Sequence, residues 1–243
     1  MKTTSKFPIE ILVYPFLVIA AMWIIYWGEF VAPFDLTHLG ILPRTSSGLT
    51  GILFAPLLHS TNDINHLLNN SIPIFFLLMA LFFFYKKAAL KVISIGWILT
   101  GTLTWLIAKN EGSYHIGMSG IIYALIFFLF ISGILKKEKQ YQAISLLIVI
   151  LYGSLIWGVF PMEEKVSWEG HLGGTISGIF LAFYYFEKPT IIEVNSNKFE
   201  HWNDINYINN KANNYDVNQS ISDTRYNAYY EYIPTKRLEK NDS

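Results

Sequence analysis

The stretch His115-Ile-Gly-Met-Ser-Gly-Ile-Ile-Tyr-Ala-Leu-Ile-Phe-Phe128 decides how the rest of the chain is interpreted. It predicts an apolar helix whose first turns carry Ser119 between Gly117 and Gly120, with Tyr123 one turn below the serine. Each glycine costs a helix roughly 1 kcal/mol, and in return it lets another backbone or a substrate approach the hydroxyl. The same small residues also serve plain helix packing, so the motif gains meaning only from what other helices place at the same depth.

The composition is that of a membrane protein. Of the 243 residues, 52% are hydrophobic and only 15% are charged, and the charges cluster between long apolar runs. The formal net charge is zero, so no basic surface points to nucleic acid as a partner. The chain has no cysteine, which excludes disulfides, thiol catalysis and thiolate metal sites.

Six stretches are long enough to cross a bilayer, for which about 20 mostly apolar residues are needed. They are residues 9–27, 66–85, 88–108, 116–135, 143–160 and 168–186. The first is too long for the core of a signal peptide and no small-residue cleavage site follows it, so we interpret it as a retained anchor. The sequence therefore predicts an all-α polytopic membrane protein with a bundle of six transmembrane helices.

Two further segments complete the predicted organisation. Residues 28–65 form a long first loop, in which Leu49–Leu58 is expected to lie in the interface or to dip back into the membrane, where protein covers its backbone. After Phe186 the chain becomes rich in asparagine, tyrosine and charge. We therefore predict a membrane domain over residues 1–187 and a mostly disordered cytoplasmic tail over residues 188–243.

Lysines and arginines in the short loops predict the orientation of the spans. With a cytoplasmic N-terminus, nine of these residues fall inside and three outside. The inner set is Lys2, Lys6, Lys86, Lys87, Lys91, Lys136, Lys137, Lys139 and Lys188, and the outer set is Arg44, Lys109 and Lys165. Both termini are therefore expected to be cytoplasmic, in what we take to be a bacterial inner membrane.

With this topology, three spans enter from the outer side and carry hydrogen-bonding residues at one shallow depth. His66 opens the second span with Asn70 one turn below it, and Ser119 and His171 each lie about three residues into theirs. Ionisable residues inside a membrane are costly and usually functional. We therefore predict a site at this level, while His38, His59 and His115 are equally well explained as side chains that reach the headgroups.

The chemistry expected of this site is nucleophilic catalysis. A serine hydroxyl needs a base, and histidine has a suitable pKa near neutrality. The spacing of Gly174 and Gly178 after His171 favours close packing of the sixth span on the fourth, which would bring the imidazole to Ser119. Because no Asp or Glu occupies these positions and Glu169 points to another helix face, we predict a Ser-His dyad rather than a triad.

Such a dyad also needs donors for the oxyanion that forms during acyl transfer. The His66 and Asn70 side chains and the backbone N–H of Ser119 are the candidates, and Tyr123 is placed to stack on the imidazole.

These motifs together resemble the rhomboid family of intramembrane serine proteases. The residues that carry the resemblance are His66-x-x-x-Asn70, Gly117-Met-Ser119-Gly120 with Tyr123, and His171 followed by Gly174 and Gly178. Gly40-Ile-Leu-Pro43-Arg44 and the region from Leu58 to Asn70 are similar in style, so the resemblance covers about residues 40–186.

The resemblance implies a six-helix core and cleavage of single-pass membrane proteins among the membrane lipids, without a metal or cofactor. It makes Ser119 the nucleophile, His171 the base, and His66 and Asn70 the oxyanion donors. Three features depart from the family pattern: a longer interval from His59 to His66, no evident Trp-Arg pair in the first loop, and Gly170 where an alanine is more usual.

Three other functions compete with this one. Polar residues at one depth could line the pathway of a small transporter, although they stop in the outer third of the membrane. A metalloprotease could use His59, Asp63 and His66, although a helical His-Glu-x-x-His is missing. A catalytically inactive relative could act as a membrane scaffold, although such relatives typically lose the serine or the histidine that this chain keeps.

Overall fold

The computed structural model describes residues 8–32, 34–109, 112–162 and 166–186, and the predicted tail lies outside this range. The described part consists of helices joined by loops, with one isolated β-bridge between Ile41 and His115. Its α-helices are α1 (Glu10–Val31), α2 (Gly51–Phe54), α3 (Ile64–Phe84), α4 (Ala89–Ile107), α5 (Ser119–Lys136), α6 (Lys139–Tyr152) and α7 (Trp168–Tyr184). Four 3-10 turns complete the set: η1 (Thr37–Leu39), η2 (Ser47–Leu49), η3 (Ala55–Leu57) and η4 (Gly153–Val159).

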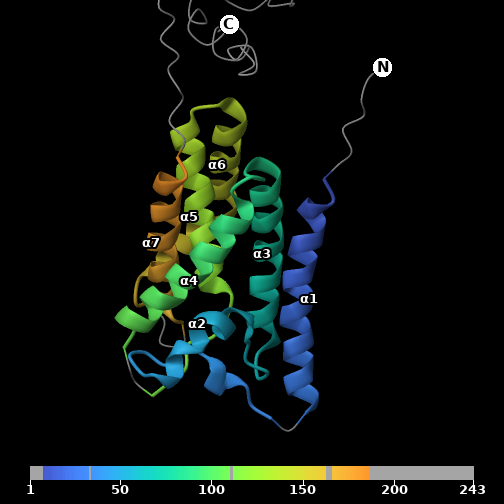
Figure 1. The fold of residues 1–243 in the computed structure, drawn as a ribbon, viewed down its shortest axis with the longest axis vertical. Helices are drawn as coiled ribbons and strands as arrows, with labels where there is room; N and C mark the ends of the chain where they lie inside the picture. The colour runs from blue at the N-terminus through green and yellow to red at the C-terminus, as the bar shows by residue number, and fades with distance from the viewer. Residues whose placement is uncertain (1–7, 33, 110–111, 163–165, 187–243) are drawn as a thin grey trace, which may run out of the picture. The chain divides into compact units, whose positions relative to one another are not determined.

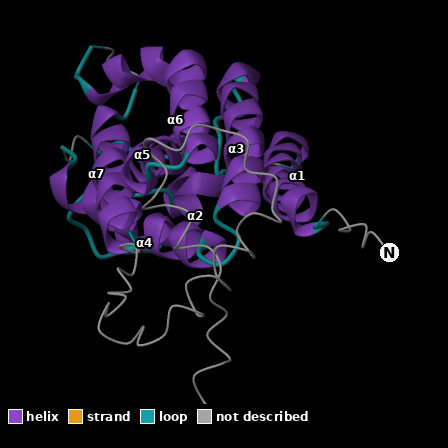
Figure 2. Cartoon of the chain, turned by 90° about the horizontal axis from the view of Figure 1, so that it is seen from above, coloured by secondary structure: helices purple, strands orange, loops and turns teal. Residues whose placement is uncertain are grey.

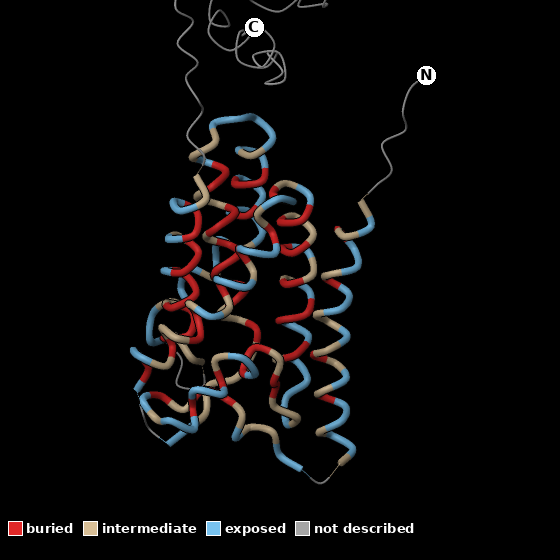
Figure 3. Tube along the Cα trace, viewed as in Figure 1, coloured by how far each residue is buried: buried red, intermediate tan, exposed pale blue. Residues whose placement is uncertain are grey.

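Helix α5 is the centre of the bundle, with α7, α4, α3 and α6 packed around it (Figures 1 and 2). Among the five stretches that are long enough to span a membrane, α5 has the largest buried share, and Figure 3 shows the buried residues gathered along the inside of the bundle. Helix α1 stands at the edge and packs mainly on α3, where Tyr14 stacks on Phe82 and the Trp23 indole donates a hydrogen bond to Ser71. The apolar core therefore runs along α5 and the inner face of α3.

Five helical stretches are long and apolar enough to span a membrane. They are α1, α3, α4, α5 and the continuous stretch of α6 with η4. Helix α7 has 17 residues and lies alongside them, packed against both α4 and α5. The all-helical bundle with a short apolar helix in the first loop confirms the predicted fold class. Five of the six predicted spans reach this length, and the sixth corresponds to the shorter α7.

Several helix boundaries differ from the sequence prediction by a few residues, and two of these differences have a clear local reason. Helix α1 continues to Val31 because nothing after Gly28 breaks it until Ala32 turns extended ahead of Pro33. Helix α5 begins at Ser119 and not at residue 116, because Gly117 has a φ of +109°, which no helical residue adopts. Ser119 is thus the first residue of its helix rather than one turn inside it.

The first loop folds against the end of the bundle at which α5 and α7 begin (Figure 1). Its apolar segment Ser47–Leu57 forms short helical turns that lie against α4, where the Trp97 indole donates a hydrogen bond to the Leu53 carbonyl. Arg44 donates hydrogen bonds to the carbonyls of Leu106 and Ala108 at the end of α4. These contacts fix the loop as a cover beside the N-terminus of α5.

Candidate active site

Ser119 and His171 face each other across the α5–α7 interface. The Ser119 Oγ lies 2.9 Å from the His171 Nε2, within hydrogen-bond distance. Ser119 is partly exposed, whereas His171 is buried. The pair predicted from equal depth in two spans is therefore brought together in the folded chain.

The other nitrogen of His171 determines what this contact can do. His171 Nδ1 lies 2.9 Å from the carbonyl oxygen of Gly158, which can only accept a hydrogen bond. Nδ1 must therefore carry the proton, and Nε2 is left as an acceptor for the Ser119 hydroxyl. A serine that donates to an oriented imidazole is the geometry of an activated nucleophile.

Tyr123 holds the imidazole from one side. Its ring stacks on that of His171, with centroids 4.2 Å apart and planes 10° from parallel, and its hydroxyl donates a hydrogen bond to the Leu155 carbonyl. Both carbonyl acceptors, at Leu155 and Gly158, belong to the 3-10 segment η4. This segment thus positions the His171 imidazole and its stacking partner Tyr123 together.

Gly158 is a site residue that the sequence analysis did not identify. A Cβ at this position would overlap the Tyr123 hydroxyl and stand 3.1 Å from the His171 Nδ1. Only a glycine lets its own carbonyl reach the imidazole at this distance. The available signal was the sequence Trp157-Gly158 at the end of a predicted span, which is too common to single out.

His66 and Asn70 lie beside Gly117, two residues before Ser119. A Cβ at Gly117 would stand 2.7 Å from the His66 Nε2 and 3.7 Å from the Asn70 Nδ2, so the missing side chain makes room for both. The Asn70 Nδ2 donates to the His66 carbonyl at 2.9 Å, which fixes the orientation of the amide. Two polar side chains of α3 therefore stand next to the turn that leads into α5.

His59 lies next to His66 and Asn70, although the sequence analysis leaves its role open. It is only 2% exposed, and its Nε2 lies 3.2 Å from the Asn70 Nδ2 and 3.5 Å from the Met118 backbone nitrogen. Its Nδ1 lies 3.3 Å from the Leu57 carbonyl, so the proton belongs on Nδ1 and Nε2 accepts from Asn70. A buried histidine thus connects the first loop to α3 and to the turn before Ser119.

The protonation of His59 agrees with this role. Burial, together with the neighbouring His66 and against an opposing effect of the Leu57 carbonyl, lowers the pKa of His59 from the usual 6.5 to about 4. His59 is therefore neutral at physiological pH, as an acceptor must be.

Glycines bring α5 and α7 into close backbone contact. A Cβ at Gly174 would overlap the Gly120 carbonyl, and one at Gly178 would overlap the Ala124 carbonyl. A Cβ at Gly120 would in turn stand 2.8 Å from a Thr100 methyl group. The stripe predicted from spacing thus lies against α5, and it determines the distance between Ser119 and His171.

The remaining candidate residues have other positions. His115 is paired through its backbone with Ile41, and its Nδ1 lies 2.6 Å from the Ser167 hydroxyl. His38 is outside the site, where its ring contacts the Asp35 carbonyl. The Glu169 carboxylate accepts from the Lys109 backbone N–H rather than from His171. Among the described residues, His59, Asp63 and His66 form no group that could hold a metal ion.

Comparison with known proteins identifies the family. A family model for the rhomboid domain matches residues 46–188, more than half of the chain, so the chain belongs to the rhomboid family of multi-pass membrane proteins. Uncharacterized proteins of Mycobacterium bovis and Mycobacterium tuberculosis are 37% identical over 156 residues, and one of Mycobacterium leprae is 35% identical over 160 residues. These matches cover 59% to 61% of this chain and 61% to 62% of the relatives' own length.

Proposed function

We propose that this protein is an intramembrane serine endopeptidase that cleaves the transmembrane segments of single-pass membrane proteins. The observation that carries the proposal is the 2.9 Å contact between the Ser119 hydroxyl and an imidazole whose second nitrogen is committed to the Gly158 carbonyl. Membership of the rhomboid family supports it. The reaction is hydrolysis of a peptide bond and needs no cofactor.

In the first step, the Ser119 Oγ attacks the carbonyl carbon of the scissile bond while His171 Nε2 accepts the hydroxyl proton. The tetrahedral intermediate collapses, and the same proton passes to the leaving amine. A serine ester of the new carboxyl end remains. In the second step, water activated by His171 attacks this ester, which releases the acid and restores the hydroxyl.

The negative oxygen of each intermediate is stabilised by donors near Gly117. The Ser119 backbone N–H has no acceptor within its own helix because Ser119 is the first helical residue, and the positive end of the α5 dipole adds to it. His66 and Asn70 stand beside this point. In the described structure, Asn70 donates to His59 and to the His66 carbonyl, so it serves the oxyanion by giving up the bond to His59.

The site faces the outer side of a bacterial inner membrane in this proposal, with both termini in the cytoplasm. The asymmetry of nine basic residues against three supports this orientation. Single cysteines in place of Lys165 and Lys137 test it, since the chain has no other thiol. An impermeant thiol reagent on intact cells should label the first and spare the second, and the reverse labelling would invert the topology.

The decisive experiment combines a fluorophosphonate probe with a model transmembrane substrate in liposomes. Ser119→Ala should abolish both labelling and cleavage. The matched control is Ser177→Ala, which removes a buried hydroxyl on α7 that bonds only to the Gly173 carbonyl, and this variant should keep both activities. Cleavage that survives in Ser119→Ala would reject the proposal, and a parent protein inert to probe and substrate would favour a scaffold instead.

A further inference from the structure

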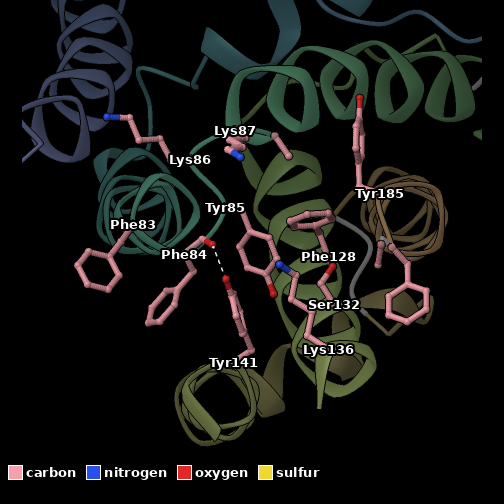
Figure 4. A pocket seen from close by; sticks show the side chains of 13 residues that line it. Phe83, Phe84, Tyr85, Lys86, Lys87, Phe128, Ser132, Lys136, Tyr141 and Tyr185 are labelled. Atoms are coloured by element: carbon pink, nitrogen blue, oxygen red, sulfur yellow. Dashed lines mark hydrogen bonds between the residues drawn. The ribbon is translucent and has the colours of Figure 1, made fainter. Parts of the chain in front are cut away.

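A second polar feature lies at the opposite end of the bundle from the candidate active site. A cavity of about 360 Å³ opens where α3 ends, α4 begins, and α5 and α7 end (Figure 4). Lys136, the last residue of α5, lines it, whereas Ser119 is the first residue of the same helix. The two sites are thus separated by about 25 Å along α5.

Lysines supply all the charge in this cavity. Lys86, Lys87 and Lys136 line it, and the described lining contains neither aspartate nor glutamate. Lys86 is already engaged, because its amino group pairs with Glu10 of α1 at 3.4 Å. The cavity therefore presents a net positive potential from Lys87 and Lys136.

The ammonium of Lys136 lies against two aromatic rings, and the nearby Glu138, which acts electrostatically on Tyr85, makes no ion pair with it. The ammonium lies 4.3 Å from the centre of the Tyr141 ring and 5.1 Å from that of Tyr85, so two aromatic faces position it (Figure 4). Tyr141 is itself fixed by a hydrogen bond from its hydroxyl to the Phe84 carbonyl. Among the described residues, no carboxylate comes within ion-pair distance of Lys136. The charge of Lys136 therefore remains available to an anion.

The walls of the cavity are suited to an amphiphile rather than to a small inorganic anion. The Tyr85 hydroxyl is buried in the wall of the cavity beside Ser132. Phe83, on the rim, is 59% exposed on the flank of a membrane-spanning helix. The cavity thus places the cationic Lys136 close to Phe83, whose surface faces the hydrocarbon of the membrane.

We propose that this cavity binds an anionic glycerophospholipid of the cytoplasmic leaflet. Its phosphate is held by the ammonium of Lys136, with Lys87 at the rim, and its acyl chains run over Phe83 along α3. The cavity lies at the lysine-rich end of the bundle, which is the cytoplasmic end in the orientation proposed above, where anionic lipids attract basic residues. This binding does not depend on the proposed protease activity.

Native mass spectrometry of the full-length protein tests this site with phosphatidylglycerol and phosphatidylcholine of identical chains. We expect phosphatidylglycerol to bind preferentially, and Lys136→Gln to reduce its occupancy about fivefold, the factor for one interfacial lysine. Lys136→Arg should retain binding because it keeps the charge. The matched control is Lys91→Gln, which removes an exposed lysine at the same end that does not line the cavity, and it should bind as the parent does.

Two results would overturn the assignment: equal binding of the two lipids, or equal loss in Lys136→Gln and Lys91→Gln. A third arm adds inorganic phosphate alone, and full displacement of the lipid by an equal concentration of phosphate would make this a free-anion site. If Lys136→Gln does not fold, Lys87→Gln serves in its place. That rim variant should lower phosphatidylglycerol occupancy at least about twofold, and parent-like occupancy would count against the site.

Discussion

The two ends of α5 hold their polar groups in opposite ways. At Ser119, the polar side chains are connected to each other or to backbone carbonyls: the serine to His171, His171 to Gly158, and Asn70 to His59. At Lys136, a cation rests on two aromatic rings with no described carboxylate near enough to pair with it. Acyl transfer requires side chains that are already hydrogen-bonded in the right geometry, whereas binding of an anion requires a cation that has no ion-pair partner within the protein.

If the Ser119 end is preorganised for catalysis, removal of the base should produce the largest effect. We expect His171→Ala to lower kcat by about 10³-fold or more, because the serine then has no acceptor for its proton. Substrate cleavage in liposomes and the rate of fluorophosphonate labelling measure this. His38→Ala, which removes a histidine outside the site, should match the parent. Probe labelling at the parent rate in His171→Ala would mean that another base acts.

Gly158→Ala tests whether the backbone carbonyl orients the base. The added methyl group overlaps the Tyr123 hydroxyl and crowds the His171 Nδ1, so the imidazole should tilt away from Ser119. We expect kcat to fall about 10²-fold, in line with the cost of small displacements at a reacting centre, with little loss of thermal stability. Gly153→Ala is the matched control, since its Cβ would meet only a Val149 methyl at 3.8 Å. Equal kcat values for the two variants would contradict the role of Gly158.

Asn70→Ala separates a donor to the oxyanion from a packing residue. Loss of one preorganised donor commonly costs about 10² to 10³ in kcat, and we expect at least about tenfold here because His66 and a backbone N–H partly substitute. The change in KM and in the unfolding temperature should be smaller. Ser71→Ala, on the next residue of α3, is the control for packing. An activity loss that follows unfolding would remove Asn70 from the catalytic set.

The smallest expected effect is the contribution of His59 to the loss of folding stability at low pH. Because the pKa of His59 falls to about 4 in the folded protein, the unfolded chain binds more protons between pH 6.5 and 4, so stability should decrease as pH falls through that window. His59→Gln should remove part of this dependence at a cost of about 1 to 3 kcal/mol for the lost buried contacts. Thermal unfolding of the two proteins from pH 7 to pH 4 measures the difference. Parallel curves would show that His59 does not titrate in this range.

The sequence predicted the side chains of the site better than its backbone. Ser119, His171, His66 and Asn70 could be placed because polar residues inside apolar spans are conspicuous and helix spacing gives their depth. The Gly158 carbonyl could not be found in this way, since every residue has a carbonyl and only the fold shows which one meets His171.

Loop residues were harder still. His59 lies in a segment without helical periodicity, so its direction was open until the first loop was seen to fold onto α3. The sequence predicts the start of α5 three residues too early, because the apolar run extends back through residues 116–118. The positive φ of Gly117 keeps these residues out of the helix, which begins at Ser119.

His171 rests on a peptide carbonyl, a neutral dipole, where many serine hydrolases place a carboxylate. For a protease of the proposed kind, the imidazolium that forms in the transition state of each step would be stabilised by the partial negative charge of a carbonyl oxygen rather than by the full charge of a carboxylate. Turnover would then be slow by the standard of soluble serine proteases, and a bound segment would often leave before it was cut. Under those conditions the residence time of a segment would determine substrate specificity, because the segments that stay longest beside Ser119 are the ones that are cleaved.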